Sequence, residues 1–252
     1  MSFMILRLLL LTCLTLAASH AQQPPPSKPA KSAHSLRLLC VEAAAGADRL
    51  VVLEKSDKGW VPRWRLAVSA GFLTDPLGFK TRSLALGIDP APPAATGGFN
   101  GPARPVTEAL TIIPFHEFQL PESDTVTAVL IADPAGAESK RPYRVILLDT
   151  NRTRFAEGSI LMQNFTESNV AGVFGGKPAK VGPGQAQVVT PGIDQAGDMA
   201  QITLARAEGE SWKVFCDTRW PAKTDYRRYL LLLPRQDGAI HPFIMPEYPP
   251  FR

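Results

Sequence analysis

The apolar residues of this chain fall in short runs, each bounded by glycine, proline, asparagine or aspartate. Runs of about four to eight residues are typical of β-strands. The 252 residues include 24 prolines and 19 glycines, and this high proline share argues against a bundle of long helices. Because 45% of the residues are hydrophobic and 20% are charged, the chain has enough apolar material for a core. The pattern predicts an all-β protein.

The strand-sized runs divide into two groups. The largest change of composition between them lies at 133–142, where Asp-Pro-Ala-Gly-Ala is followed by a charged stretch. We therefore predict two β-sandwich-like units, a first β-rich domain at 36–135 and a second at 142–246, with a tail at 247–252. Each unit would have about 100 residues, an ordinary domain size. Since no sequence repeat relates the halves, one larger sandwich with interleaved strands is the alternative.

The N-terminus has the pattern of a secretory signal peptide. Arg7 precedes an apolar run at 8–18, and Ser-His-Ala at 19–21 is a small-x-small cleavage sequence. We predict a signal peptide at 1–21 and a Pro-rich flexible spacer at 22–35. No later run approaches the roughly 20 apolar residues of a membrane span. We expect an exported protein, periplasmic or extracellular, with no transmembrane segment after signal removal.

The charge and cysteine content give two further expectations. The formal net charge of +4 is spread along the chain, whereas a nucleic-acid-binding protein would show a basic stripe with a motif, so we expect no nucleic acid partner. After processing, Cys40 and Cys216 remain, and an oxidising compartment would let them pair. Both fall in alternating apolar segments, so two separate buried thiols are the alternative to a disulfide.

A search for catalytic motifs gives none. The chain has no Gly-x-Ser-x-Gly elbow, no Ser-x-x-Lys pair, no Cys-x-x-Cys and no dinucleotide-binding glycine pattern. The histidines after residue 21 are far apart in sequence, unlike the paired ligands of a metal helix. His116 and Glu117 are adjacent, but neighbours on a strand point to opposite faces. We therefore predict no catalytic residues, no metal site and no cofactor.

Tryptophan and arginine are the remaining candidates for a binding site. Tryptophan rings stack on sugars, and arginines hold carboxylates or phosphates in a fork. An exposed cluster of these residues could bind an anionic glycan, whereas tryptophans that close the ends of a sandwich are the simpler interpretation. The candidate ligand-binding residues are Trp60, Trp64, Arg65, Arg219 and Trp220.

Several short motifs follow one another in the second half of the chain. They are Tyr143 to Asp149, Arg154-Phe155, Glu157-Gly158-Ser159, Asn164-Phe165-Thr166, Gly175-Gly176-Lys177 and Pro183-Gly184, with Trp212, Asp217 to Trp220 and Leu233-Pro234-Arg235 beyond them. Through these motifs, residues 143–235 resemble a group of uncharacterised exported bacterial β-rich proteins. The resemblance implies an envelope or secreted location and brings no catalytic residues with it.

Together these features lead to a functional expectation. We expect an exported, non-catalytic structural or interaction module of the bacterial cell envelope, whose partner is an envelope polymer or another envelope protein. The alternative is a carbohydrate or anionic-polymer binding module that uses the tryptophans and arginines. A hydrolase built from scattered acidic residues has the least support, because nothing in the sequence selects its carboxylates.

Overall fold

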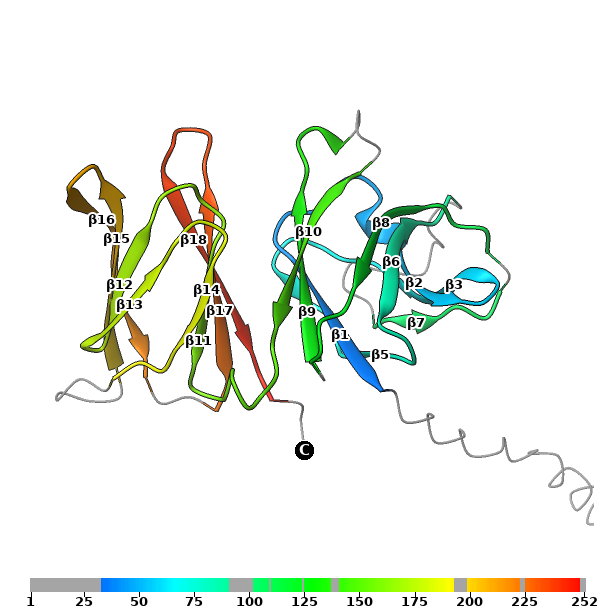
Figure 1. Ribbon diagram of the computed structural model, residues 1–252, viewed down its shortest axis with the longest axis horizontal. Coiled ribbons are helices and arrows are strands. Elements are labelled where there is room, and N and C mark those ends of the chain that lie inside the picture. Colours follow the sequence, from blue (N-terminus) through cyan, green and yellow to red (C-terminus); the bar gives the residue numbers. More distant parts are fainter. Residues whose placement is uncertain are drawn as a thin grey trace, which may run out of the picture. The chain divides into compact units, whose positions relative to one another are not determined.

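Figure 1 shows a computed structural model of the chain, which describes residues 33–90, 102–108, 110–123, 125–136, 141–192, 199–222 and 225–249. These residues form strands and turns, with a short 3-10 helix, η1, at Ala47–Arg49. In the described ranges, no helix has the length and apolar character needed to cross a membrane. The all-β prediction is confirmed.

The strands are collected in two groups along the chain. The first group is β1 (His34–Cys40), β2 (Leu50–Ser56), β3 (Gly59–Leu66), β4 (Phe72–Leu73), β5 (Leu77–Phe79), β6 (Ser83–Ile88), β7 (Arg104–Pro105), β8 (Pro114–Gln119), β9 (Thr125–Ala132) and β10 (Tyr143–Asp149). The second group is β11 (Ile160–Asn164), β12 (Val170–Phe174), β13 (Lys177–Val181), β14 (Ala186–Val189), β15 (Met199–Glu208), β16 (Ser211–Pro221), β17 (Arg227–Pro234) and β18 (Ile240–Glu247).

Each group of strands forms two sheets. In the first group, one sheet has the order β10-β9-β1-β4, with β5 also paired to β1, and the other has the order β7-β3-β2-β6-β8. In the second group, the orders are β14-β11-β17-β18 and β13-β12-β15-β16. Every sheet takes its strands from one group, which matches the prediction of two sandwiches rather than the interleaved alternative.

The two groups have the same topology once the short strands β4 and β7 are set aside. The sheet β5-β1-β9-β10 corresponds to β14-β11-β17-β18, and β3-β2-β6-β8 corresponds to β13-β12-β15-β16. In both groups the first strand pairs in parallel with the last but one, as β1 does with β9 and β11 with β17. The described chain is therefore a tandem repeat of one sandwich. We call residues 34–149 the first repeat and 160–247 the second repeat.

A β-bulge supports this correspondence. The ladder between β6 and β8 shifts register between Leu86 and Gly87, and the ladder between β15 and β16 shifts between Leu204 and Ala205. A bulge places an extra residue on one strand and is a specific local feature of a ladder. Matching the two bulges aligns Gly87 with Ala205, so the repeats can be compared residue by residue although their sequences show no repeat.

One sheet of each repeat is buried on both of its faces. Along β17, Leu230 and Leu232 contact the core of the second repeat, whereas Tyr229, Leu231 and Leu233 contact the facing sheet of the first repeat. A strand covered on both sides has no solvent-facing positions, which explains why its sequence is a continuous apolar run. We call β10-β9-β1-β4 and β14-β11-β17-β18 the inner sheets, and the other two the outer sheets (Figure 1).

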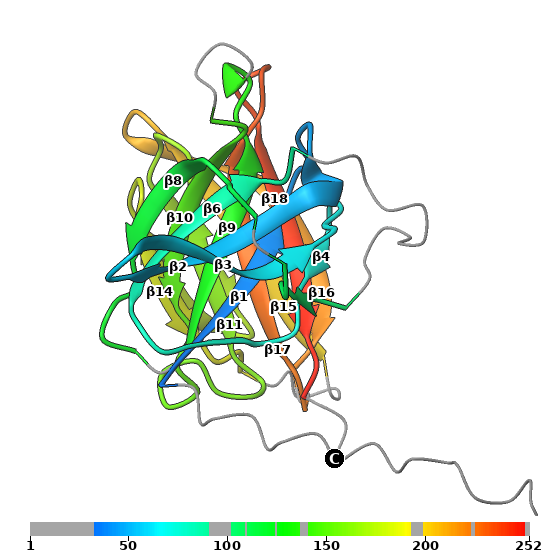
Figure 2. The ribbon, with the colours of Figure 1, turned by 90° about the vertical axis from the view of Figure 1, so that its right-hand side faces the viewer.

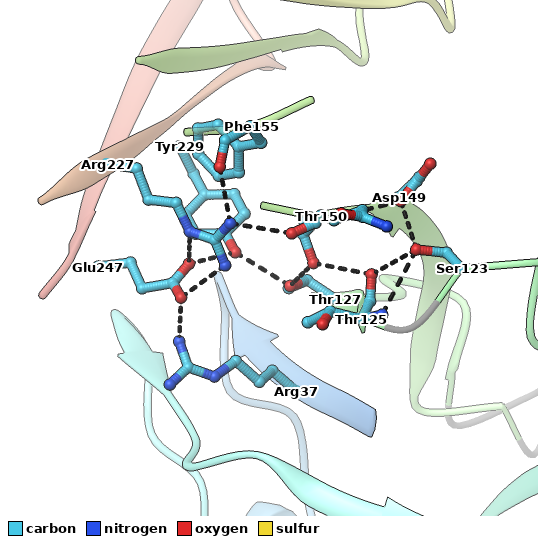
Figure 3. A network of polar contacts seen from close by, with 11 residues as sticks. Arg37, Ser123, Thr125, Thr127, Asp149, Thr150, Phe155, Arg227, Tyr229 and Glu247 are labelled. Carbon is cyan, nitrogen blue, oxygen red and sulfur yellow. Dashed lines mark hydrogen bonds and ion pairs between the residues drawn. The ribbon is translucent and has the colours of Figure 1, made fainter. Parts of the chain in front are cut away.

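A buried ion-pair cluster joins the inner sheets of the two repeats (Figure 3). Arg227 on β17 holds the Glu247 carboxylate with two bonds, from Nε to Oε2 at 2.8 Å and from Nη2 to Oε1 at 2.7 Å. Arg37 on β1 donates to Oε1 of the same carboxylate, and the Tyr229 hydroxyl donates to Oε2 at 2.7 Å. All four side chains are buried. Two guanidinium groups, one from each repeat, thus share one carboxylate.

The cluster extends into the linker between the repeats. Nη1 of Arg227 donates to the carbonyls of Thr150 and Phe155, each at 2.9 Å. Burial opposes ionisation of Glu247, but the hydrogen bonds from Arg227 and the charges of Arg37 and Arg227 hold the pKa of its carboxyl below the ordinary value. The cluster therefore stabilises one arrangement of the linker against the inner sheets.

Sheet membership differs from the predicted domain bounds. β10 pairs with β9 along its whole length, so it belongs to the first repeat rather than to a second domain beginning at 142. The composition change at 133–142 spans the connection between these two strands, where the Asp133 amide donates to the Pro142 carbonyl. Glu247, at the start of the predicted tail, lies in β18 and is buried. The division between the repeats falls at 150–159.

Most residues of the predictions for the N-terminus lie outside the ranges that the structure describes. The predicted signal peptide at 1–21 and the spacer up to residue 32 lie outside the described residues. His34 and Ser35, placed at the end of the predicted spacer, are already part of β1 and pair with β5. The first strand therefore begins two residues earlier than the apolar run.

Candidate functional site

The first group of predicted site residues lies on β3 and makes contacts within the first repeat. Trp60 donates from Nε1 to the Glu117 carboxylate at 3.1 Å. Trp64 is half-buried against the core and donates from Nε1 to a backbone carbonyl of β5 at 3.3 Å. Arg65 pairs with the Asp89 carboxylate at 2.5 Å. These contacts join β3 to β8, to β5 of the other sheet and to Asp89 after β6.

The second group lies on β16, in the outer sheet of the other repeat. Trp220 packs against the core of the second repeat. Arg219 lies on the outward face, where its Nε donates to Oε1 of Gln201 at 3.1 Å. Because β3 and β16 belong to different outer sheets, the structure does not bring the predicted tryptophans and arginines together in one cluster.

The proposed disulfide is not formed. Cys40 and Cys216 are free thiols, because β1 places Cys40 in the core of the first repeat and β16 places Cys216 beside the core of the second. Burial, with a smaller contribution from the Glu42 charge, raises the pKa of the Cys40 thiol to about 12. Burial also raises the pKa of Cys216. Both thiols pack as small apolar side chains, the alternative that the sequence left open.

The outward face of the second repeat carries an exposed surface of small residues. Along β15, Ala200, Ile202 and Leu204 are buried in the core, so the residues between them point outward. Side by side on neighbouring strands lie Ala205 of β15 and Ala171 of β12, followed by Thr203 and Val173. Short side chains on adjacent strands leave space above the sheet.

That space is an open depression of about 520 Å³. Its walls include apolar groups of Val173, Pro178 and Ala179, and Lys180 and Gln187 supply polar groups. Val173 is 45% exposed although it lies in the middle of a sheet. We call this surface, with its neighbours on β16, the bare face.

Two large side chains of β16 continue the apolar surface. Trp212 is 46% exposed and Val214 is 56% exposed, and Val214 lies opposite Ala205. The ammonium of Lys180 lies 5.4 Å from the centre of the Trp212 ring, within the range of a cation-π contact. The bare face therefore combines apolar contact area with an exposed cation.

A chain of polar side chains continues along the bare face. The Asp217 carboxylate accepts hydrogen bonds from Gln201 and from the Thr203 hydroxyl, the latter at 3.0 Å. Gln201 in turn accepts from Arg219, as described above. These four side chains therefore orient one another along the face.

A second, smaller pocket of about 370 Å³ lies at the edge strand β8. His116 and Glu117 both line it, together with Arg141, although a regular strand would point the two neighbours to opposite faces. The register shift lies before His116, and His116 and Glu117 pair in regular register with Leu86 and Ala85, so their side chains keep opposite faces of the strand. Burial and then the Arg141 charge lower the pKa of His116, and its ring stacks on Phe118 at 5.9 Å. This polar pocket offers much less apolar surface than the bare face.

Comparison of the sequence with models of known protein families gives no match, and comparison with curated proteins gives none either. Among the described residues, no three side chains of His, Cys, Asp or Glu gather as a metal site would require. The function must therefore be argued from the geometry of the bare face.

Of the residues on this face, Arg219 is among the candidates expected from the sequence, whereas Trp212, Val173 and Lys180 are not. Trp212 and Val214 alternate along β16, which by itself is equally typical of a buried strand. The signal that distinguishes them is the row of small residues, such as Ala205, on the strand opposite. Which strand lies opposite becomes known only from the sheet order.

Proposed function

We propose that this chain is a non-catalytic interaction module of the bacterial cell envelope, which is exported and holds a partner on the bare face. The observation that carries the proposal is the exposed apolar depression in the middle of an ordered sheet, bordered by Trp212 and Val214. Contiguous apolar patches on a protein surface are typical of interaction sites. The signal-peptide pattern at 1–21 supports the location.

The chemistry of the depression favours binding over catalysis. Lys180 is the titratable side chain among the residues that line it. The nearest carboxylate described above, Asp217, is engaged by Gln201 and Thr203. Hydrolysis of a glycoside would use a pair of carboxylates on either side of the bond. The described residues of this face supply shape, apolar area and a cation instead.

A saccharide is the second candidate for the occupant of this face. Its support is the exposed indole of Trp212 together with the polar chain of Asp217, Gln201 and Arg219. Aromatic rings that stack on sugars and planar polar groups that bond hydroxyls are a common combination in saccharide sites. A carbohydrate site is also the alternative expected from the sequence, and Arg219 is the candidate residue that belongs to it.

Binding to the full chain tests the proposal. The probes are peptidoglycan, lipopolysaccharide, a glycan panel and a displayed peptide library, and the readout is saturable binding. We expect Val173→Asp to weaken the binding by at least about tenfold, because a carboxylate in an apolar contact is costly. Ile113→Asp is the matched control, since Ile113 is an apolar residue of the first repeat that is 85% exposed. Equal binding by both variants, or turnover of a polymer by the purified chain, would overturn the proposal.

A further inference from the structure

The outward face of the first repeat is covered by the chain itself. β7 and β8 lie at opposite edges of this outer sheet, so the residues between them must cross it. Residues 106–108 and 110–113, which we call the strap, pass over the outward side, and Figure 2 looks onto this sheet. Ile112 of the strap forms a buried cluster with Val51, Leu53 and Ala85, and Leu110 packs against it.

The contacts of the strap are close and specific. A Cβ atom on Gly87 would lie 2.4 Å from Cγ2 of Ile112, so Ile112 packs directly against the backbone of Gly87. At the other end, the Val106 amide donates to the Arg63 carbonyl at 3.0 Å, and the Glu108 carboxylate lies 3.6 Å from Arg65. The strap therefore contacts the sheet through one acidic side chain, Glu108, and two apolar side chains, Leu110 and Ile112.

The second repeat has no such segment in its described residues. In the first repeat, residues 89–113 connect β6 to β8. In the second repeat the equivalent strands, β15 and β16, are joined by a tight hairpin at Gly209, which has a φ of 61°. The ladders that align Gly87 with Ala205 also align Val51 with Ala171 and Leu53 with Val173. The first residue of each pair is fully buried under the strap, whereas the second is partly exposed.

We infer that the bare face binds an extended segment of a partner protein, which crosses the strands of the second repeat as the strap crosses those of the first. The inference rests on the proposed function and names the occupant of the same site. The strap supplies the pattern Glu108-x-Leu110-x-Ile112, an acidic residue followed by two apolar residues at alternate positions. A partner segment with the same pattern would fill the depression with its two apolar side chains.

The cations of the two faces indicate where the acidic residue of the partner segment would lie. Arg65 of β3 lies opposite Val51, and Lys180 of β13 lies opposite Ala171, so these two cations are equivalent. Arg65 contacts Glu108 of the strap, whereas Lys180 is exposed at the edge of the depression beside Trp212. An acidic residue of the partner would therefore meet Lys180, and the apolar residues after it would reach Val173 and Ala205.

A displayed library of random eight-residue peptides tests this inference on the full chain. Peptides are selected on the wild type after removal of those that bind Val173→Asp. We expect enrichment of an acidic residue followed by alternating apolar residues, with binding weakened at least about tenfold by Val214→Asp, since Val214 borders the same depression. Lys180→Glu should weaken binding by reversing the charge that meets the acid. Ile113→Asp, away from this face, should bind as the wild type does.

The outcomes separate the inference from the proposed function. Enriched peptides without the alternating pattern, peptides unaffected by Val214→Asp, or no peptides at all would overturn the inference. If peptides fail while a saccharide binds the wild type and not Val173→Asp, the bare face is a binding face and its occupant is a glycan. If no probe shows binding that depends on Val173, the proposed function fails as well. The thermal midpoint of each variant shows that it is folded.

Discussion

The outward faces of the two repeats correspond residue by residue between their two central strands and share one bulge, but they differ in what lies above them. In the first repeat the strap covers Val51 and Leu53, which are fully buried. In the second repeat the equivalent residues are Ala171 and Val173, and they line an open depression. On β2 the larger apolar side chains of Val51 and Leu53 lie under the strap, and on β12 the smaller Ala171 and Val173 lie in the depression. On the neighbouring strands the order is reversed, since Gly87 and Ala85 lie under the strap and Ala205 and Thr203 lie in the depression.

The largest expected effect is on the inner sheets, whose facing sides are buried between the two repeats. Glu247→Gln should lower the free energy of unfolding by about 3 to 5 kcal/mol, because it leaves the buried charges of Arg37 and Arg227 without their carboxylate. Urea denaturation measures this. Glu122→Gln is the control, since the Glu122 side chain is 89% exposed and pairs with Arg82 at the surface. If both variants lose equally little, the cluster does not hold the inner faces together.

A matched pair of truncations tests the outer faces directly. Leu53→Ala should cost about 2 to 5 kcal/mol, because Leu53 is buried on the face covered by the strap. Val173→Ala, at the equivalent position, should change stability by less than about 1 kcal/mol, because Val173 is 45% exposed. Similar losses in the two variants would show that the bare face is covered in solution, for example by a second copy of the chain.

A third substitution tests the fit of the strap. Gly87→Ala should cost about 1 to 3 kcal/mol, because its methyl group would overlap Ile112 and displace the strap. Limited proteolysis should then cut within 106–113 faster than in the wild type. The reverse change at the aligned position, Ala205→Gly, should leave cleavage in the strap unchanged. If Gly87→Ala is as stable and as resistant as the wild type, the strap does not press on the sheet.

Much of the architecture could be predicted from the sequence, because short apolar runs between turn residues determine the strands. The continuous run at 229–233 already indicates a strand covered on both sides. The boundary between the repeats could not be placed, since the charged stretch at 133–142 resembles a linker although it joins two paired strands. The topological repeat could not be recognised from the sequence either. Core positions accept many different apolar residues, so only the sheet order shows which strands of the two repeats correspond.

The bare face was harder to predict than the fold. Trp60 and Trp64 were selected for their chemistry, yet both make hydrogen bonds that hold the first repeat together. Val173 carries no chemical signal of its own. Val173 is exposed because the described residues of the second repeat include no segment like the strap. Whether such a segment is present depends on the connection between β15 and β16 and not on the strand that carries Val173.

The smallest expected effect is the response of the inner interface to acid. The pKa of Glu247 is lowered from its ordinary value of 4.5, so its contribution to stability is present above that pH and is lost as the pH falls through the lower folded-state pKa. The free energy of unfolding of the wild type should therefore decline below about pH 4.5 more steeply than that of Glu247→Gln, which has no proton to take up there. Unfolding curves between pH 3 and pH 7 measure both slopes. Parallel profiles would place the acid response outside the cluster, whereas a difference confined to low pH would show that protonation of the Glu247 carboxylate weakens the cluster.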